Sequence, residues 1–256
     1  MVETRVRNVL ILGATSAIAA EVARKFAADG HRLYLIARNR AGLAALVDEL
    51  DTAVAGHEVA DLDQLDQAEA RIARAVAALG RIDVALIAHG ALGDQLRSER
   101  ELDMALASVH TNLLSPIALL IPLANHFERR AVEQHGAGHL GVITSVAGER
   151  GRPRNYTYGA AKGGLSRYLE GLRSRLHRRG VVVHDFRLGP VDTPMTATHA
   201  KNRLFAQPRP VALAIVRGLA SRRHTHYVPG FWRWIMLVVR NLPERLFTRL
   251  PFLSGR

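Results

Sequence analysis

The chain of 256 residues contains no cysteine, and this absence excludes several kinds of chemistry at once. Disulfide frameworks, thiolate metal sites, iron–sulfur clusters and cysteine nucleophiles all require that residue. No uncharged stretch approaches the roughly 18 apolar residues that a membrane-spanning helix needs, and no apolar leader follows the opening Met-Val-Glu-Thr-Arg. We therefore expect a cytoplasmic protein without a transmembrane helix.

Lysine is also scarce, whereas arginine is abundant and unevenly distributed. Lysine and arginine together number 35 against 23 acidic residues, which gives a formal charge of +12. The stretch 221–256 holds seven arginines against a single acid, Glu244. A basic face can serve nucleic acid, anionic lipid or solubility. Nucleic-acid binding needs exposed aromatics interleaved with the basic residues, and in this stretch they are too clustered and apolar, so we expect no nucleic-acid partner.

Short β-branched runs alternate with longer helical patterns from the start of the chain to about position 230. This rhythm predicts an α/β fold with a Rossmann-type, doubly wound parallel sheet, and the ligand crevice of such a sheet lies at the carboxyl ends of its strands. We predict one domain at 1–230 and a C-terminal helical appendage at 231–256. The seven predicted strands are Asn8–Leu12, Arg32–Ala37, Ala53–Val59, Asp83–Ala88, Leu140–Thr144, Val181–Arg187 and Thr225–Val228.

A glycine-led turn, Gly13-Ala-Thr-Ser-Ala-Ile-Ala19, joins the first strand to the helical pattern after it. Glycine permits a tight turn there, and the N–H groups of the first helical turn point at an anion above them. Phosphate binding is the natural use of this geometry. Only one of three expected glycines is present, however, so an ordinary strand-to-helix turn with a serine cap fits equally well.

Further candidate residues follow the next three strands. Arg38 stands where a dinucleotide site meets the adenosine ribose, and arginine there suits a 2′-phosphate, which favours NADP(H) and leaves NAD(H) as the alternative. Asp61 and Leu62 are placed for the adenine edge, although Asp61 also suits a helix cap. Ala88-His-Gly90 forms a small corner near the expected nicotinamide ribose. We expect His89 to be packed or solvated rather than catalytic.

The sharpest signal is Tyr158-Gly-Ala-Ala-Lys162. A tyrosine and a lysine four residues apart share one helix face, so we expect the ammonium to lower the phenol pKa from about 10. A phenol tuned in this way exchanges a proton with a carbonyl or an alcohol. Ser145 stands thirteen residues before Tyr158 at a strand end, and Asn112 lies in a long helical pattern, so these side chains can face one crevice.

With these motifs the chain resembles the short-chain dehydrogenase/reductases over residues 8–230. The resemblance implies a nicotinamide cofactor, no metal, and a homodimer or homotetramer. It implies that a tyrosine protonates the substrate oxygen and that an asparagine anchors a proton-relaying water. The catalytic tetrad would be Asn112, Ser145, Tyr158 and Lys162. The cofactor contacts would include Gly13, Thr15, Ser16, Ile18, Ala88, Gly90, Tyr158, Lys162, Val191 and Thr193. Ala17 and Ala19 depart from the family's glycine loop.

A narrower resemblance is carried by Gly90-Ala-Leu-Gly-Asp94, Ala147-Gly-Glu-Arg150 and the stretch from Phe231 to Pro243. These segments are similar to the ketoreductase subunits of decaprenylphosphoryl-ribose 2′-epimerases. In that family a flavoprotein oxidises the 2′-hydroxyl of a lipid-linked ribose, and the reductase returns hydride to give the arabinose epimer. The resemblance implies a lipid-linked sugar substrate and a flavin oxidase partner. The alternatives are a soluble hydrophobic ketone, such as a 3-oxoacyl chain, or a non-catalytic dinucleotide-binding partner or sensor.

The segment from Phe231 to Arg240 is unusually apolar for a surface helix. If it is helical, Arg233 and Arg240 share one narrow stripe and apolar residues cover most of the remaining circumference. Ten residues span about 15 Å, so the helix can lie in a membrane interface but cannot cross the bilayer. We expect 231–250 to contact the inner face of the plasma membrane. A lid over the substrate pocket and packing on a sister subunit are alternatives.

Overall fold

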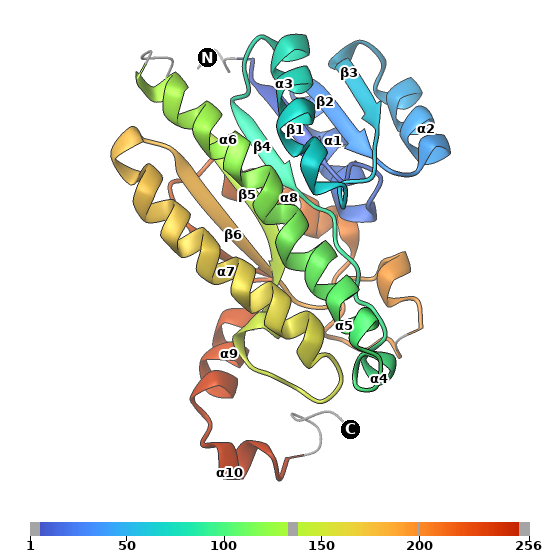
Figure 1. Cartoon of the computed structure of the whole chain (residues 1–256), viewed down its shortest axis with the longest axis vertical. Helices are drawn as coiled ribbons and strands as arrows, with labels where there is room; N and C mark the ends of the chain where they lie inside the picture. The colour runs from blue at the N-terminus through green and yellow to red at the C-terminus, as the bar shows by residue number, and fades with distance from the viewer. Residues whose placement is uncertain (1–5, 133–137, 199, 251–256) are drawn as a thin grey trace.

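The computed structural model describes residues 6–132, 138–198 and 200–250, so the outermost residues of the two predicted segments, 1–5 and 251–256, lie outside the described part. The described residues form one parallel seven-stranded sheet in the order β3-β2-β1-β4-β5-β6-β7 (Figure 1). The predicted Rossmann-type sheet is confirmed, and the predicted strand bounds differ from the observed ones by one residue at most. The strands are β1 (Asn8–Leu12), β2 (Arg32–Ala37), β3 (Val54–Val59), β4 (Val84–Ile87), β5 (His139–Ser145), β6 (Val182–Leu188) and β7 (Thr225–Val228).

Helices cover both faces of this sheet. The buried side chains of α3, α6 and α7 pack on one face, and those of α1, α2 and α8 pack on the other. Because both faces are covered, the strands read as nearly continuous apolar runs. The helices are α1 (Ala17–Ala28), α2 (Arg40–Leu50), α3 (Ala68–Leu79), α4 (Gln95–Ser98), α5 (Leu102–Val109), α6 (Ser115–Val132), α7 (Tyr156–Leu176), α8 (Pro208–Leu219), α9 (Trp232–Asn241) and α10 (Glu244–Phe247).

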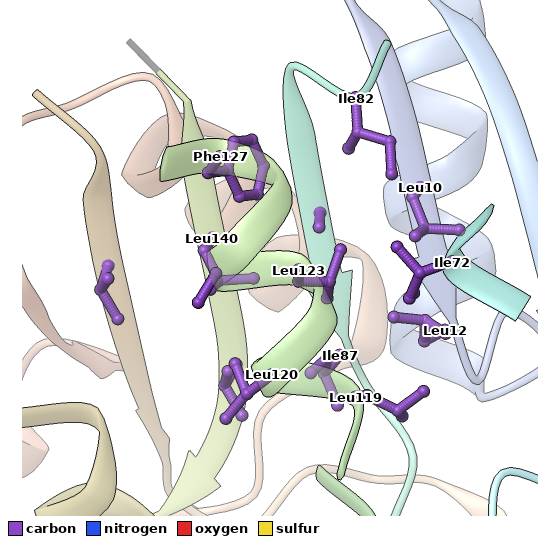
Figure 2. Close-up of a cluster of buried hydrophobic side chains, with 14 of the residues drawn as sticks. Leu10, Leu12, Ile72, Ile82, Ile87, Leu119, Leu120, Leu123, Phe127 and Leu140 are labelled. Atoms are coloured by element: carbon purple, nitrogen blue, oxygen red, sulfur yellow. The ribbon is translucent and has the colours of Figure 1, made fainter. Parts of the chain in front are cut away.

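One helix, Leu102–Ala131, is long and apolar enough to cross a membrane by length and composition alone, with a mean hydropathy of 1.6. From the sequence we expected no such segment. Packing accounts for part of this apolar character, because Leu119, Leu123 and Phe127 of α6 lie fully buried against the sheet, next to Leu140 of β5 (Figure 2). Other apolar residues of this stretch stay open to solvent, and a third of its apolar window is buried.

The C-terminal helices α9 and α10 lie beyond the carboxyl ends of the strands, outside the two main helix layers (Figure 1). Trp232, Met236 and Val239 of α9 are buried in a small cluster with Val146 and Phe247. The opposite side of α9 stays apolar yet open to solvent, so the helix has a buried inner face and an exposed outer face. The exposed apolar residues of this outer face are Phe231, Trp234, Leu237 and Val238.

Three histidines on β5, β6 and β7 form a hydrogen-bonded ladder across the sheet. His139 Nδ1 lies 3.1 Å from His184 Nε2, and His184 Nδ1 lies 3.1 Å from His226 Nε2. His184 is completely buried. Burial, together with the neighbouring imidazoles, lowers the pKa of His184 to about 3, and burial lowers the pKa of His139 to about 4. The ladder is therefore neutral at physiological pH.

We expect acid to destabilise the protein as the pH falls from about 6.5 to about 4. In this window the unfolded chain protonates the His184 and His139 imidazoles, whereas the folded chain holds them neutral, so the unfolded state binds more protons. The free energy of unfolding should fall by on the order of 3 kcal/mol for each of the two imidazoles, as measured by urea unfolding at several pH values. His89 and His139 titrate in the same window, so His184→Gln should make this slope shallower without abolishing it, whereas His57→Gln at an exposed histidine should leave it unchanged. Equal slopes in both variants would exclude the ladder as the cause.

Candidate active site

Three of the predicted catalytic side chains meet where β5 ends. Ser145 is the last residue of β5, and its Oγ accepts a hydrogen bond from the Ala147 N–H at 3.1 Å. Tyr158 and Lys162 stand one turn apart on α7, and the Lys162 Nζ lies 5.8 Å from the centre of the Tyr158 ring. Lys162 is buried and donates to the carbonyl of Ile143 at 3.2 Å. The packing of the first turns of α7 beside the carboxyl end of β5 therefore brings serine, tyrosine and lysine together.

The protonation of this cluster differs from the sequence expectation. Burial raises the pKa of Tyr158 to about 12, and a hydrogen bond with Ser145 offsets only part of this rise. Burial lowers the pKa of Lys162 to about 8, against the opposing effect of the Asp185 carboxylate. The prediction that the pKa of Tyr158 falls below 10 is wrong, because desolvation of the phenolate outweighs the hydrogen bond with Ser145.

Asn112 lies in a π-helical turn, His110–Leu114, that joins α5 to α6. Its Nδ2 donates to the carbonyls of Ala91 at 2.7 Å and Ser108 at 2.9 Å, and its Oδ1 accepts from the Ala91 N–H at 3.2 Å. Both amide hydrogens are thus used within the protein. The side chain thereby holds the loop after β4 in place. The role of Asn112 in anchoring a proton-relaying water, which the family resemblance implies, stays a prediction.

Gly13 gives the loop after β1 the shape of a phosphate-binding turn. Its φ is +85°, a conformation that L side chains rarely adopt, and a Cβ there would lie 2.7 Å from the backbone nitrogen of His89. Ser16 then caps α1 by accepting from the Ala19 N–H at 3.2 Å. The first-turn N–H groups of α1 follow this cap at the carboxyl edge of the sheet, where they can bind a phosphate.

Gly90 forms a second glycine cradle after β4. A Cβ at this position would lie 2.8 Å from Asn112 Oδ1 and 3.2 Å from Lys162 Nζ. The absence of a side chain therefore lets Asn112 and the catalytic lysine lie directly against the backbone of this loop.

His89 is packed, as expected, and leaves one buried acceptor. The Ser115 hydroxyl donates to the carbonyl of Leu62 at 2.7 Å, so it accepts from His89 Nε2 at 2.8 Å. Burial lowers the pKa of His89 to about 3, and the ring is therefore neutral with a lone pair on Nδ1. Nδ1 has no hydrogen-bond partner among the described residues. A hydroxyl of a bound dinucleotide would satisfy it, and with the two glycine cradles the residues present fit this cofactor.

The adenosine end of the predicted site lies at the ends of β2 and β3. The Arg38 guanidinium lies 3.9 Å from the Asp61 carboxylate, with the two side chains 77% and 42% exposed. An exposed pair at this distance contributes little and leaves the guanidinium available to a ligand phosphate. Leu62 instead buries its side chain in the core, so only its backbone can face the site.

The remaining predicted cofactor positions also follow strand ends. Val191 and Thr193 come after β6, where Val191 is buried and Thr193 opens a short 3-10 turn. Thr15, Ile18 and Ala88 are half-buried around the ends of β1 and β4. The predicted positions are thus gathered along one edge of the sheet, in agreement with the crevice expected from strand order.

Asp185 was not among the predicted site residues, although it bears on the catalytic lysine. Its carboxylate is completely buried, accepts from the Thr144 hydroxyl, and accepts from Arg187 Nε at 2.8 Å. It also raises the pKa of Lys162 against the effect of burial. The signal in the sequence is a charged residue inside the apolar run of β6, where an unpaired carboxylate would be costly.

A doubly wound sheet with glycine cradles and a Ser–Tyr–Lys cluster at its carboxyl edge defines an NAD(P)-dependent oxidoreductase that acts on CH–OH and C=O groups. The family profile described as short chain dehydrogenase matches residues 7–204, and the chain belongs to this family. An uncharacterized oxidoreductase of Mycobacterium tuberculosis is 37% identical over 254 residues, which cover 98% of this chain and all of that protein.

Further comparisons agree with this family. A Streptomyces coelicolor protein named as a ketoacyl reductase is 29% identical over 191 residues, covering 74% of this chain and 72% of that protein. Among solved structures, actinorhodin polyketide ketoreductase with NADPH superposes with a TM-score of 0.76 at 24% identity, covering 90% of this chain and 98% of that one. A 3-ketoacyl-(acyl-carrier-protein) reductase from Brucella melitensis, complexed with NADH, gives a TM-score of 0.78 at 22% identity, with 87% and 96% coverage. These two structures share the fold.

Proposed function

We propose that the protein is a ketoreductase that reduces the 2-keto group of a polyprenylphosphoryl pentose to the arabinose epimer, a cell-envelope glycan precursor. The observation that carries this proposal is the position of α9 beside the catalytic loop. Its outer face exposes Trp234 and Val238 to 64% and 63% among arginines, as a lipid-linked anionic substrate would require. The segment similarities at 90–94, 147–150 and 231–243 add to this support.

The site residues have distinct roles in such a reduction. NADPH or NADH, when bound, supplies a hydride to the carbonyl carbon. Tyr158 is protonated at neutral pH because its pKa is about 12, so its hydroxyl can donate a proton to the developing alkoxide. Ser145 hydrogen-bonds the same substrate oxygen. Lys162, with a pKa of about 8, is mostly cationic at neutral pH and stabilises the phenolate that the proton transfer leaves.

We propose that the two long helices after Ser108 and Asn155 form a homodimer or homotetramer interface, because Leu114 of the π-helical turn, Ile121 of α6 and Tyr156 of α7 are exposed. From the narrower family resemblance we also propose that a flavin oxidase supplies the keto substrate. We propose that the chain works in the cytoplasm at the inner face of the plasma membrane through 231–250.

The membrane contact predicts a specific loss of vesicle binding. Replacing Trp234 and Val238 together with glutamate should weaken sedimentation with anionic phospholipid vesicles by at least about tenfold, because the outer face of α9 then carries negative charge. Leu96→Glu changes another exposed apolar residue, 70% exposed on α4, and should leave binding as in the wild type. Equal binding by all three proteins would exclude this face as the contact.

A 3-oxoacyl substrate is the second candidate, and it is supported by the relative named as a ketoacyl reductase. In that case the apolar outer face of α9 would not be needed for turnover. A non-catalytic sensor is the third candidate, and the presence of all four tetrad positions argues against it.

The deciding experiment is NADPH and NADH oxidation by the purified protein, with polyprenylphosphoryl 2-keto-pentose generated in place by a flavin oxidase. Appearance of the arabinose epimer supports the proposal. Oxidation only with a 3-oxoacyl thioester supports the second candidate, and no oxidation by a protein that binds a dinucleotide supports the third. Faster oxidation of NADPH would support the cofactor preference proposed from Arg38, and faster oxidation of NADH would contradict it.

A further inference from the structure

Arg150 connects the catalytic loop to the C-terminal helices. It directly follows the 3-10 turn Val146–Glu149, which begins after Ser145. Its Nη1 donates to the carbonyls of Val239 at 2.9 Å and Leu242 at 2.5 Å. The side chain is only 12% exposed, although the residues that it contacts are about ninety positions later in the chain.

The guanidinium occupies the carboxyl end of α9. The last carbonyls of a helix have no partner within the helix, and a cation there also complements the helix dipole. The Arg150 guanidinium carbon lies 4.1 Å from the centre of the Phe247 ring, so it reaches α10 as well. Nη2 also pairs with Glu244 at 2.7 Å, but that carboxylate is 78% exposed and contributes little. The part-buried contacts of Arg150 with the Val239 and Leu242 carbonyls are therefore its main attachment to α9.

The other end of α9 is fixed at the loop after β6. A Cβ on Gly189 would lie 1.9 Å from Trp232 Nε1, so the indole lies directly on the glycine backbone. Val146, one residue after Ser145, packs into the same cluster as Trp232 and Met236. The helix α9 thus spans from the β6 loop to the loop that carries the catalytic serine.

We infer that Arg150 is a positioning residue that fixes α9 and α10 as one wall of the substrate site. Without it, the C-terminal helices lose the partner of their carbonyl groups and the wall loosens, while Ser145, Tyr158 and Lys162 keep their own contacts. Substrate affinity therefore depends on Arg150, and proton transfer does not. The kinetic consequence rests on the proposed ketoreductase function, whereas the structural consequence is independent of it.

The test compares two variants. Arg150→Met keeps an unbranched side chain but removes the guanidinium, and Arg150→Lys keeps the positive charge but not the planar group of N–H donors. In Arg150→Met, hydrogen exchange of amides 236–248 should rise by at least about tenfold, with Arg150→Lys in between. The KM for the ketone should rise by about tenfold with kcat within about twofold. The control is Arg74→Met, which removes the arginine that pairs with Glu58 of β3, at the far edge of the sheet. This variant should change neither the hydrogen exchange of 236–248 nor the KM for the ketone.

Two results would overturn the inference. Hydrogen exchange of 236–248 in Arg150→Met equal to that of the wild type would show that α9 and α10 do not depend on this side chain. A fall in kcat with an unchanged KM would place Arg150 in the chemical step. If the wild type turns over no ketone, the proposed function fails, but the exchange measurement still decides whether Arg150 fixes the wall.

Discussion

Replacing Tyr158 with phenylalanine is expected to lower ketone turnover by about 10³-fold while dinucleotide affinity stays nearly unchanged. The substitution removes a single hydroxyl and keeps the ring that packs beside Ser145 and Lys162. That hydroxyl is the proton donor for the alkoxide, and no other acid stands at the same place in the proposed geometry. Turnover is measured with saturating NADPH, and affinity by titrating the quenching of protein fluorescence.

Tyr156→Phe is the matched control, since it removes the same hydroxyl two residues earlier on the same helix. Tyr156 is 43% exposed, and an alanine rather than a lysine stands four residues after it. Its variant should keep wild-type turnover. Retained activity in Tyr158→Phe would remove this residue from the role of acid, and equal losses in both variants would point to a general effect on α7.

The sheet was predictable because its strands are buried on both faces. Apolar runs such as Val84–Ile87 stand out against amphipathic helices, and their bounds could be placed within one residue. The π-helical turn at His110–Leu114 could not be predicted in this way. Its Asn112 forms hydrogen bonds with Ala91, and such contacts between distant residues do not appear in the hydrophobic periodicity of the sequence.

The catalytic residues were predictable from spacing, but their protonation was not. Tyr158 and Lys162 are four residues apart, and this spacing, which can be read directly from the sequence, places them on one helix face. The pKa values depend on how deeply each group is buried, and burial raises the pKa of Tyr158 and lowers that of Lys162. The contact of Arg150 with α9 was likewise hidden, because it joins residues about ninety positions apart.

The second large effect concerns a place where two backbones touch beside the catalytic lysine. A Cβ on Gly163 of α7 would lie 2.6 Å from the carbonyl oxygen of Gly148, and a Cβ on Gly148 would lie 2.6 Å from the Gly163 nitrogen. Neither neighbour is a flexible side chain that could move aside. The loop after Ser145 and the helix turn that holds Lys162 are therefore separated by a distance that only glycine allows.

Gly163→Ala should consequently push the Ser145 loop away from α7. We expect kcat to fall by about 10²-fold, because a displacement near 1 Å between Ser145 and Tyr158 disrupts their alignment on the substrate oxygen. Stability should fall by about 1–3 kcal/mol through overpacking, even though alanine is the better helix former. Both quantities are measured on the purified variant, by steady-state kinetics and by urea unfolding.

Gly171→Ala separates this effect from helix propensity. Gly171 lies in the same helix, and a Cβ there meets nothing within 4 Å. Its variant should be more stable by up to about 1 kcal/mol with unchanged kcat. Gly163→Ala with the same gain would show that the loop and the helix can separate freely, and the backbone contact would then not be what sets the distance between serine and tyrosine. The opposite signs expected for the two glycines make the contact, rather than the residue type, the quantity under test.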